Sequence, residues 1–123
     1  MCNDFLKLHR GDVVIVDLGD GDNTQTHLFT KKRPAILLSN EMALRHSPIL
    51  NIACLSTNVS EAKRRLPIRI FIAANECGLS KDCTAACEQI ISIDRHKIKR
   101  RVGSLNPAVM KKIDDAVRIQ LAL

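Results

Sequence analysis

The chain has 123 residues, of which 46% are hydrophobic and 26% charged, enough for one hydrophobic core and too few for two. We therefore expect residues 1–123 to form a single domain. The formal net charge of +6 favours an anionic partner, such as a nucleic acid. Aromatic residues make up only 2% of the chain, which argues against a nucleic-acid platform built mainly on stacked bases.

Five cysteines are an odd number in a chain whose first residues carry no signal-like apolar run. This favours a reducing compartment, the cytoplasm. Cys77, Cys83 and Cys87 are separated by five and three residues rather than arranged as the close pairs of structural zinc sites. We expect neither a metal nor another cofactor. No apolar run is long enough to span a bilayer, so we expect no membrane partner.

Short runs rich in branched apolar residues predict a series of strands. The expected strands cover residues 12–18, 35–39, 50–56 and 68–72, and residues 83–93 form the last strand or pair of strands. A turn-rich acidic segment follows the first strand and runs on to Lys32. A loop of this length is usually functional or mobile.

Capping residues predict the helices. Asn40 is an N-cap for a short helix that Pro48 stops, and Asp94 can cap a basic helix over residues 95–101 that ends at Gly103. Residues 75–81 are expected to be a loop.

Asn106 followed by Pro107 starts a final helix. Its apolar residues recur at helical spacing and predict a buried stripe, made of Val109, Ile113, Ala116, Val117 and Leu121. Strands followed by a packed terminal helix indicate an α+β, mainly β, small barrel.

Two of the expected strands end in polar side chains. Residues 31–40 read KKRPAILLSN and residues 51–58 read NIACLSTN. Pro34 pushes Arg33 out of the helical region, so its guanidinium enters the strand from an extended approach. The alternative is that Arg33 is an ordinary solvated charge in a basic run.

Several short motifs occur in a fixed order along nearly the whole chain. They are Arg10-Gly11-Asp12-Val13-Val14, Arg33-Pro34, Ser39-Asn40, Cys54-Leu55-Ser56, Glu88-Gln89-Ile90 with Ile93-Asp94, and Gly103-Ser104-Leu105 before the amphipathic last helix. This ordered set resembles the MazF/PemK family of toxins from type II toxin–antitoxin modules.

The resemblance implies an SH3-like small barrel, the PemK/CcdB-like toxin fold, with a C-terminal helix. It also implies a cytoplasmic homodimer whose interface forms an RNA groove. The implied activity is metal-independent, sequence-specific cleavage of single-stranded RNA by attack of a ribose 2′-hydroxyl on the neighbouring phosphate. A MazE-like antitoxin would neutralise it.

The resemblance also assigns site residues. Arg33 matches the arginine before proline, and Ser56 matches a strand-end hydroxyl that is Thr in many members. Thr57 is a possible stand-in for Ser56, although alternation along a strand would let only one of the two face the site. His27 has a suitable intrinsic pKa for proton transfer, but a solvent-exposed loop histidine without a role is the more common case.

The expected RNA contacts fall into two groups. Glu88 and Gln89 match a segment that implies contacts to bases, whereas Ile91 stands where relatives usually have Arg, and the glycine-rich tip of the first loop is absent. Phe29 either stacks on a base or packs at the foot of its loop. The candidates for phosphate contact are Lys31, Lys32, Lys63, Arg64 and Arg65. Residues 95–101 are expected to form a solvated basic helix face.

Two other functions remain open at this point. One is a non-catalytic CcdB-like toxin that binds and inhibits DNA gyrase, and the other is a degenerate, inactive toxin. The presence of Arg33 together with a hydroxyl at Ser56 favours the enzyme, because a pure binder has no need of that pair.

Overall fold

The computed structural model describes residues 7–19, 31–57, 59–60 and 66–123. Within this part of the chain, the strands are β1 (Asp12–Asp17), β2 (Lys32–Leu37), β3 (Ile49–Ser56), β4 (Arg69–Ile72), β5 (Cys83–Asp94) and β6 (Ile98–Ser104). The helices are α1 (Glu41–His46), α3 (Ala74–Cys77) and α4 (Pro107–Leu121), with a 3₁₀ turn, η2 (Arg95–Lys97).

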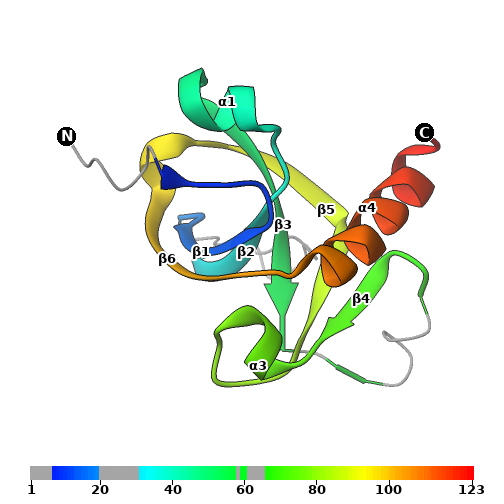
Figure 1. Cartoon of the computed structure of the whole chain (residues 1–123). Coiled ribbons are helices and arrows are strands. Elements are labelled where there is room, and N and C mark those ends of the chain that lie inside the picture. Colours follow the sequence, from blue (N-terminus) through cyan, green and yellow to red (C-terminus); the bar gives the residue numbers. More distant parts are fainter. Residues whose placement is uncertain (1–6, 20–30, 58, 61–65) are drawn as a thin grey trace.

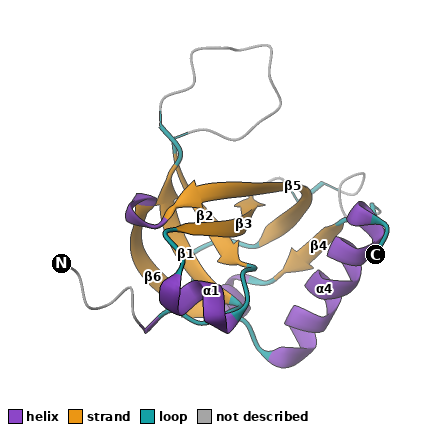
Figure 2. Cartoon of the chain, turned by 90° about the horizontal axis from the view of Figure 1, so that it is seen from above, coloured by secondary structure: helices purple, strands orange, loops and turns teal. Residues whose placement is uncertain are grey.

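The strands form one antiparallel sheet in the order β4-β5-β3-β2-β1-β6, which curls strongly (Figure 1). The edge strands β4 and β6 are not paired with each other in the described residues, so the barrel is not closed. Helix α4 packs against β4 and β5, and α1 contacts β3 (Figure 2). The expected fold class, a mainly β small barrel with a C-terminal helix, is confirmed.

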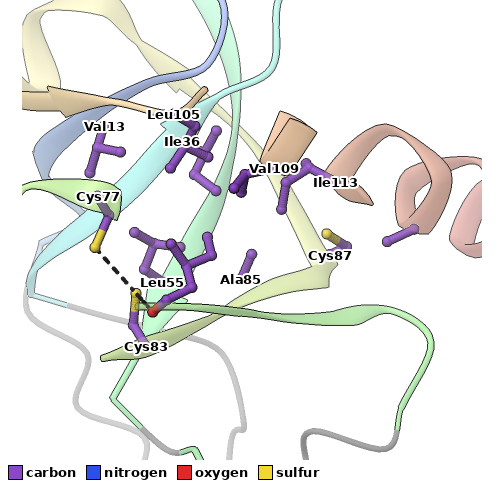
Figure 3. Close-up of a cluster of buried hydrophobic side chains, with 12 residues drawn as sticks. Val13, Ile36, Leu55, Cys77, Cys83, Ala85, Cys87, Leu105, Val109 and Ile113 are labelled. Atoms are coloured by element: carbon purple, nitrogen blue, oxygen red, sulfur yellow. Dashed lines mark hydrogen bonds between the residues drawn. The ribbon is translucent and has the colours of Figure 1, made fainter. Parts of the chain in front are cut away.

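The curled sheet buries aliphatic side chains on both of its faces. One core gathers Val13, Ile36 and Leu55 against Val109 and Ile113 of α4 (Figure 3). The other core gathers residues such as Val14, Leu37 and Ile52 with Leu44 of α1. Because Val13 and Val14 are neighbours in sequence and enter different cores, β1 is covered on both sides, as its dense branched composition predicts.

Four cysteines contribute to these cores as buried thiols. Cys77 and Cys83 lie in the α4 core with their Sγ atoms 3.8 Å apart, and Figure 3 shows them pointing toward each other. Burial, the largest cause, raises the pKa of Cys83 to about 12 and that of Cys87 to about 12. These thiols stay protonated and fill space.

Two capping predictions are confirmed. The Asn40 side chain accepts a hydrogen bond from the Ala43 N–H at 2.9 Å at the start of α1, and Asn106 caps α4 through the Val109 N–H at 2.9 Å. Along α4, the first residues of the expected stripe are buried, but Leu121 at its end is 51% exposed.

The prediction of a basic helix over residues 95–101 is wrong. Only η2 is helical, with Asp94 accepting from the His96 N–H at 3.1 Å, and the chain then continues as β6 along β1. The branched residues Ile98 and Val102 suit a strand, and β1 offers hydrogen-bonding partners that a short helix would leave unused. Consequently β5 is one long strand but not the last strand. In the expected loop over residues 75–81, α3 forms one helical turn before Gly78.

Arg95 also departs from the expected solvated face. Its Nε donates to the Ser47 carbonyl at 3.1 Å, and its terminal nitrogen donates to the Ala43 carbonyl at 3.1 Å. These carbonyls lie at the C-terminal end of α1, where a cation is favourable. Arg95 therefore ties α1 to the end of β5.

The Arg10-Gly11-Asp12 motif forms a turn that joins three elements. Asp12 is buried, and its carboxylate accepts from the His9 N–H at 2.9 Å and from Arg101 Nε of β6 at 3.1 Å. Glu41 at the start of α1 accepts from the Arg10 N–H at 3.0 Å.

None of the helices in the described residues is long and apolar enough to cross a membrane.

We predict that Glu41→Gln destabilises the fold in a pH-dependent way. The Arg10 N–H, and then the hydrogen bond with His9, hold the pKa of Glu41 below its ordinary value of 4.5. A lowered folded-state pKa stabilises the fold above pH 4.5, and this contribution is lost as the pH falls through the folded pKa. Urea unfolding should therefore show a lower midpoint for Glu41→Gln at pH 7, with the difference from wild type shrinking near pH 3.

The control is Asp115→Asn, which removes exposed ion pairs on α4 with Lys111 and Arg118. It should change the midpoint little at either pH. An effect of Glu41→Gln that is equal at both pH values would contradict the assigned role of its charge.

Candidate active site

A pocket of about 180 Å³ opens where β2 begins and β3 ends, beside the segment that leads into β5. Its lining residues are Arg33, Pro34, Leu55, Ser56, Thr57, Leu79, Ser80, Lys81 and Cys83. It thus brings together the two main catalytic candidates from the sequence.

The register of the sheet explains why Arg33 and Ser56 meet. β2 pairs with β3 through Ala35 opposite Cys54, and continuing this register by two residues places Arg33 opposite Ser56. Directly opposite residues in an antiparallel pair share a face of the sheet. β2 begins at Lys32, earlier than the expected strand, so Arg33 and Pro34 belong to the strand itself.

The charge of Arg33 also acts on the thiol of Cys54, which lies two residues before Ser56 on β3. Burial raises the pKa of Cys54 to about 11, and the positive charge of Arg33 opposes that rise. Arg33 is therefore close to β3, and the Cys54 thiol remains protonated at neutral pH. It is not a candidate nucleophile.

Both strand-end hydroxyls line the pocket, whereas alternation predicted that only one would. β3 ends at Ser56, so Thr57 lies beyond the regular strand and is not bound by its alternation. Ser56 is half-buried and pairs with Thr84 of β5, while Thr57 is exposed.

Lys81 is a lining residue that the sequence reasoning missed. It lies between α3 and β5, in a segment expected only to be loop. The available signal was a basic residue in a short segment that starts at a glycine and leads directly into a strand. Its proximity to Ser56, however, depends on the packing of β5 beside β3.

Glu88 is held by a buried partner. Arg69 Nε donates to both carboxylate oxygens at 2.9 and 2.8 Å, and a terminal nitrogen lies 2.7 Å from Oε2. The Arg69 side chain is only 5% exposed and also donates to Thr84 Oγ1 at 3.4 Å. Since Thr84 is opposite Ser56, this ion pair supports the sheet next to the pocket.

Gln89 lies in different surroundings from Glu88. It lines a second pocket of about 370 Å³ together with Asp17, Ile91, Asp94 and Lys97, among others. The two residues of the Glu-Gln segment therefore do not share one environment: Glu88 has an arginine partner, and Gln89 faces an open pocket.

The remaining candidates are divided between described and undescribed parts of the chain. Lys31 and Lys32 are exposed at the start of β2. Lys32 lies opposite Asp17 in the antiparallel register of β2 and β1. The Gly19 N–H is the main cause of a lowered pKa of Asp17, with smaller contributions from Lys99, Lys97 and Lys32. Outside the described residues lie His27, Phe29, Lys63, Arg64 and Arg65.

Within the described ranges, no three His, Cys, Asp or Glu side chains are grouped so that they could hold a metal ion.

The curled sheet, its terminal helix and a pocket with two cations and three hydroxyls define a small β-barrel protein suited to holding an anionic group such as a phosphate. A family model described as PemK-like, MazF-like toxin of type II toxin–antitoxin system matches residues 9–121. The chain belongs to this family, which confirms the resemblance found in the sequence.

Individual relatives agree along nearly the whole length. The endoribonuclease EndoA of Bacillus subtilis is 31% identical over 114 residues, covering 93% of this chain and 94% of the relative. The endoribonuclease MazF of Staphylococcus saprophyticus is 27% identical, covering 94% of this chain and 92% of the relative. A mycobacterial endoribonuclease solved in complex with its cognate antitoxin has a TM-score of 0.71 and 22% identity, covering 94% of each chain.

We predict that Arg69→Met lowers the free energy of unfolding by about 2 to 3 kcal/mol, because it leaves a half-buried carboxylate without its cation. Glu88→Gln leaves the almost fully buried Arg69 guanidinium without its counter-charge, so it should cost about 3 kcal/mol. Urea unfolding measures both. Lys111→Met is the control, because it removes only an exposed pair with Asp115 and should have almost no effect. Equal losses for Arg69→Met and Lys111→Met would contradict a structural role of the Arg69–Glu88 pair.

Proposed function

We propose that the chain is a cytoplasmic, metal-independent endoribonuclease toxin that cleaves single-stranded RNA at short sequences. One observation carries this proposal: Arg33 and Ser56 line the same pocket in a chain whose relatives are named endoribonucleases. The described cysteines are unpaired thiols, which supports a reducing compartment.

The proposed reaction uses a nucleophile that RNA itself supplies. The ribose 2′-oxygen attacks the neighbouring phosphorus as the bond to the 5′-oxygen breaks. The products are a 2′,3′-cyclic phosphate and a free 5′-hydroxyl. A proton leaves the 2′-hydroxyl and a proton reaches the 5′-oxygen, so the protein must hold the phosphate in line and stabilise the negative charge of the transition state.

Arg33 is suited to the second of these tasks. Its guanidinium presents several donors to the equatorial oxygens of the phosphate and supplies positive charge that a metal ion would otherwise have to bring. A guanidinium keeps its proton, so it cannot be the general base. Ser56 lies opposite Arg33 when the β2–β3 register is continued. Its hydroxyl donates a hydrogen bond to the phosphate and so orients the phosphate for in-line attack. Thr57 is the second hydroxyl at this position.

Proton transfer requires a further group. His27 remains our proposal for this role because imidazole titrates near neutral pH. It lies in the segment between β1 and β2, ahead of Arg33 in the chain.

We propose that sequence recognition uses Gln89, whose side-chain amide can pair with a base edge and whose pocket has an apolar part at Ile91. Glu88 belongs to the same proposed interface, with Arg69 fixing its carboxylate. The proposed phosphate contacts outside the pocket are Lys31, Lys32, Lys63, Arg64 and Arg65, and Phe29 is a proposed base contact.

The proposed partners follow from charge and family. A chain with a net charge of +6 complements both RNA and an acidic antitoxin segment that folds on binding. A mycobacterial endoribonuclease of the same fold was solved with its cognate antitoxin, which supports a MazE-like antitoxin for this chain. We further propose that the single domain forms a homodimer whose interface contributes to the RNA groove.

We predict discrete cleavage of a long single-stranded RNA in excess EDTA, with 2′,3′-cyclic phosphate ends at the mapped cuts. Arg33→Ala should lower the single-turnover rate by about 100- to 1000-fold, because one charged donor to the transition state is lost. Ser56→Ala should lower it less, and Ser56→Thr should retain activity because the hydroxyl is kept. Lys112→Ala, which removes an exposed charge on α4, should cleave like wild type.

If wild type leaves RNA of many sequences intact, the proposed endoribonuclease activity is wrong. That outcome would favour the non-catalytic toxin that binds DNA gyrase, or an inactive protein. Cleavage that disappears in EDTA but returns with added Mg²⁺ would overturn metal independence alone.

A further inference from the structure

We propose that Lys81 is a second phosphate-binding residue of this site, placing its ammonium on the scissile phosphate from the flank of β3 opposite to Arg33. This inference rests on the proposed RNA cleavage.

Its position in the sheet supports this arrangement. The strand order places β3 between β5 and β2. Arg33 belongs to β2, Ser56 ends β3, and Lys81 stands two residues before β5. All three line the same pocket of about 180 Å³. The Ser56 hydroxyl therefore has a cation on either side.

The segment that carries Lys81 is fixed at both ends. At its start, Gly78 has φ 77° and packs so closely on β6 that an added Cβ would lie 2.5 Å from the Val102 carbonyl oxygen. At its end, the Asp82 carboxylate accepts from the Ala74 N–H at 2.8 Å, and buried Cys83 pairs with Ile72. The backbone that presents Lys81 is thus held against α3, β4 and β6, while the lysine itself is exposed.

The neighbouring acid does not cancel this charge. Asp82 is directed to the start of α3. The described residues that line this pocket include two cations and no carboxylate, whereas the pocket of Gln89 includes Asp17 and Asp94. The Gln89 pocket also contains Lys97, so its charges are mixed, whereas the described charges of the Arg33–Lys81 pocket are only cations and suit a phosphate better.

Lysine adds something that Arg33 does not. Its ammonium is a compact charge on a flexible stem, so it can follow the phosphate as negative charge builds up on the non-bridging oxygens. Two cations on one phosphate stabilise this additional charge more than one does, and they do so only while the phosphate is held between them.

The test compares Lys81→Ala and Lys81→Arg with Lys112→Ala, an exposed α4 lysine whose loss changes the net charge equally. The probes are the RNA cut by wild type and the same RNA with a 2′-deoxy sugar at the cut site. We expect Lys81→Ala to slow single-turnover cleavage by about 10- to 100-fold. The slope of log K against log salt for the deoxy RNA should fall in magnitude by about 0.7, the share of one phosphate contact in a single strand. Lys81→Arg should restore most of the rate and the slope.

Three results would overturn the proposal for Lys81 while wild type still cleaves. In the first, Lys81→Ala matches Lys112→Ala in rate and in salt slope. In the second, the rate falls but the salt slope is unchanged. In the third, Lys81→Arg is as slow as Lys81→Ala. If wild type leaves the RNA intact, the proposed function fails first, and the salt slope is then measured with the uncut RNA itself. An unchanged slope for Lys81→Ala would also reject the phosphate contact.

Discussion

The pairing register of β2 with β3 is the constraint on which the site depends. It sets Ala35 against Cys54 and so brings Arg33 beside Ser56 at the mouth of the sheet. A shift of one residue would turn every side chain of β2 to the other face and separate the two groups. The cores oppose this shift through side-chain size, because Ile36 fills one core while Ala35 and Leu37 fill the other, and close-packed cores do not accept the exchange of Ala35 for Ile36.

Some charged side chains of this sheet hold its strands together, and others line the pocket. Arg69 is almost fully buried, and its contacts to Glu88 and Thr84 hold β4 and β5 together. Thr84 lies opposite Ser56 of β3, which is half-buried and lines the pocket. The buried charge of Arg69 is thus paired with Glu88 within the sheet. The cations Arg33 and Lys81 line a pocket into which an anion can bind.

The sequence predicted the elements whose signals are local. Asn40 and Asn106 cap helices as their neighbouring residues indicate, and the branched runs form β1 and β3. β6 could not be recognised because its residues 98–101 are mostly basic, and the strand exists through pairing with β1 far away in the sequence. The SH3-like barrel fold came only from the resemblance, since periodicity does not contain topology.

The candidate site divides in the same way. Arg33 and Ser56 were named as candidates because a motif and strand-end chemistry mark them, and both line one pocket. The partner of Glu88 was not found, because Arg69 is 19 residues away and reaches it only across the β4–β5 pair. Lys81 was missed because nothing in its own segment indicates that β5 lies next to β3. Thr57 was misjudged since the point where a strand ends is poorly fixed by sequence.

The central claim is that Arg33 and Ser56 act on one phosphate, and a double-mutant cycle tests it most directly. Single-turnover cleavage would be measured for wild type, Arg33→Ala, Ser56→Ala and the double variant. Groups that act together give non-additive losses, so we expect the double variant to be scarcely slower than Arg33→Ala alone. Losses that multiply in the double variant would contradict a shared phosphate and place the two residues in separate tasks.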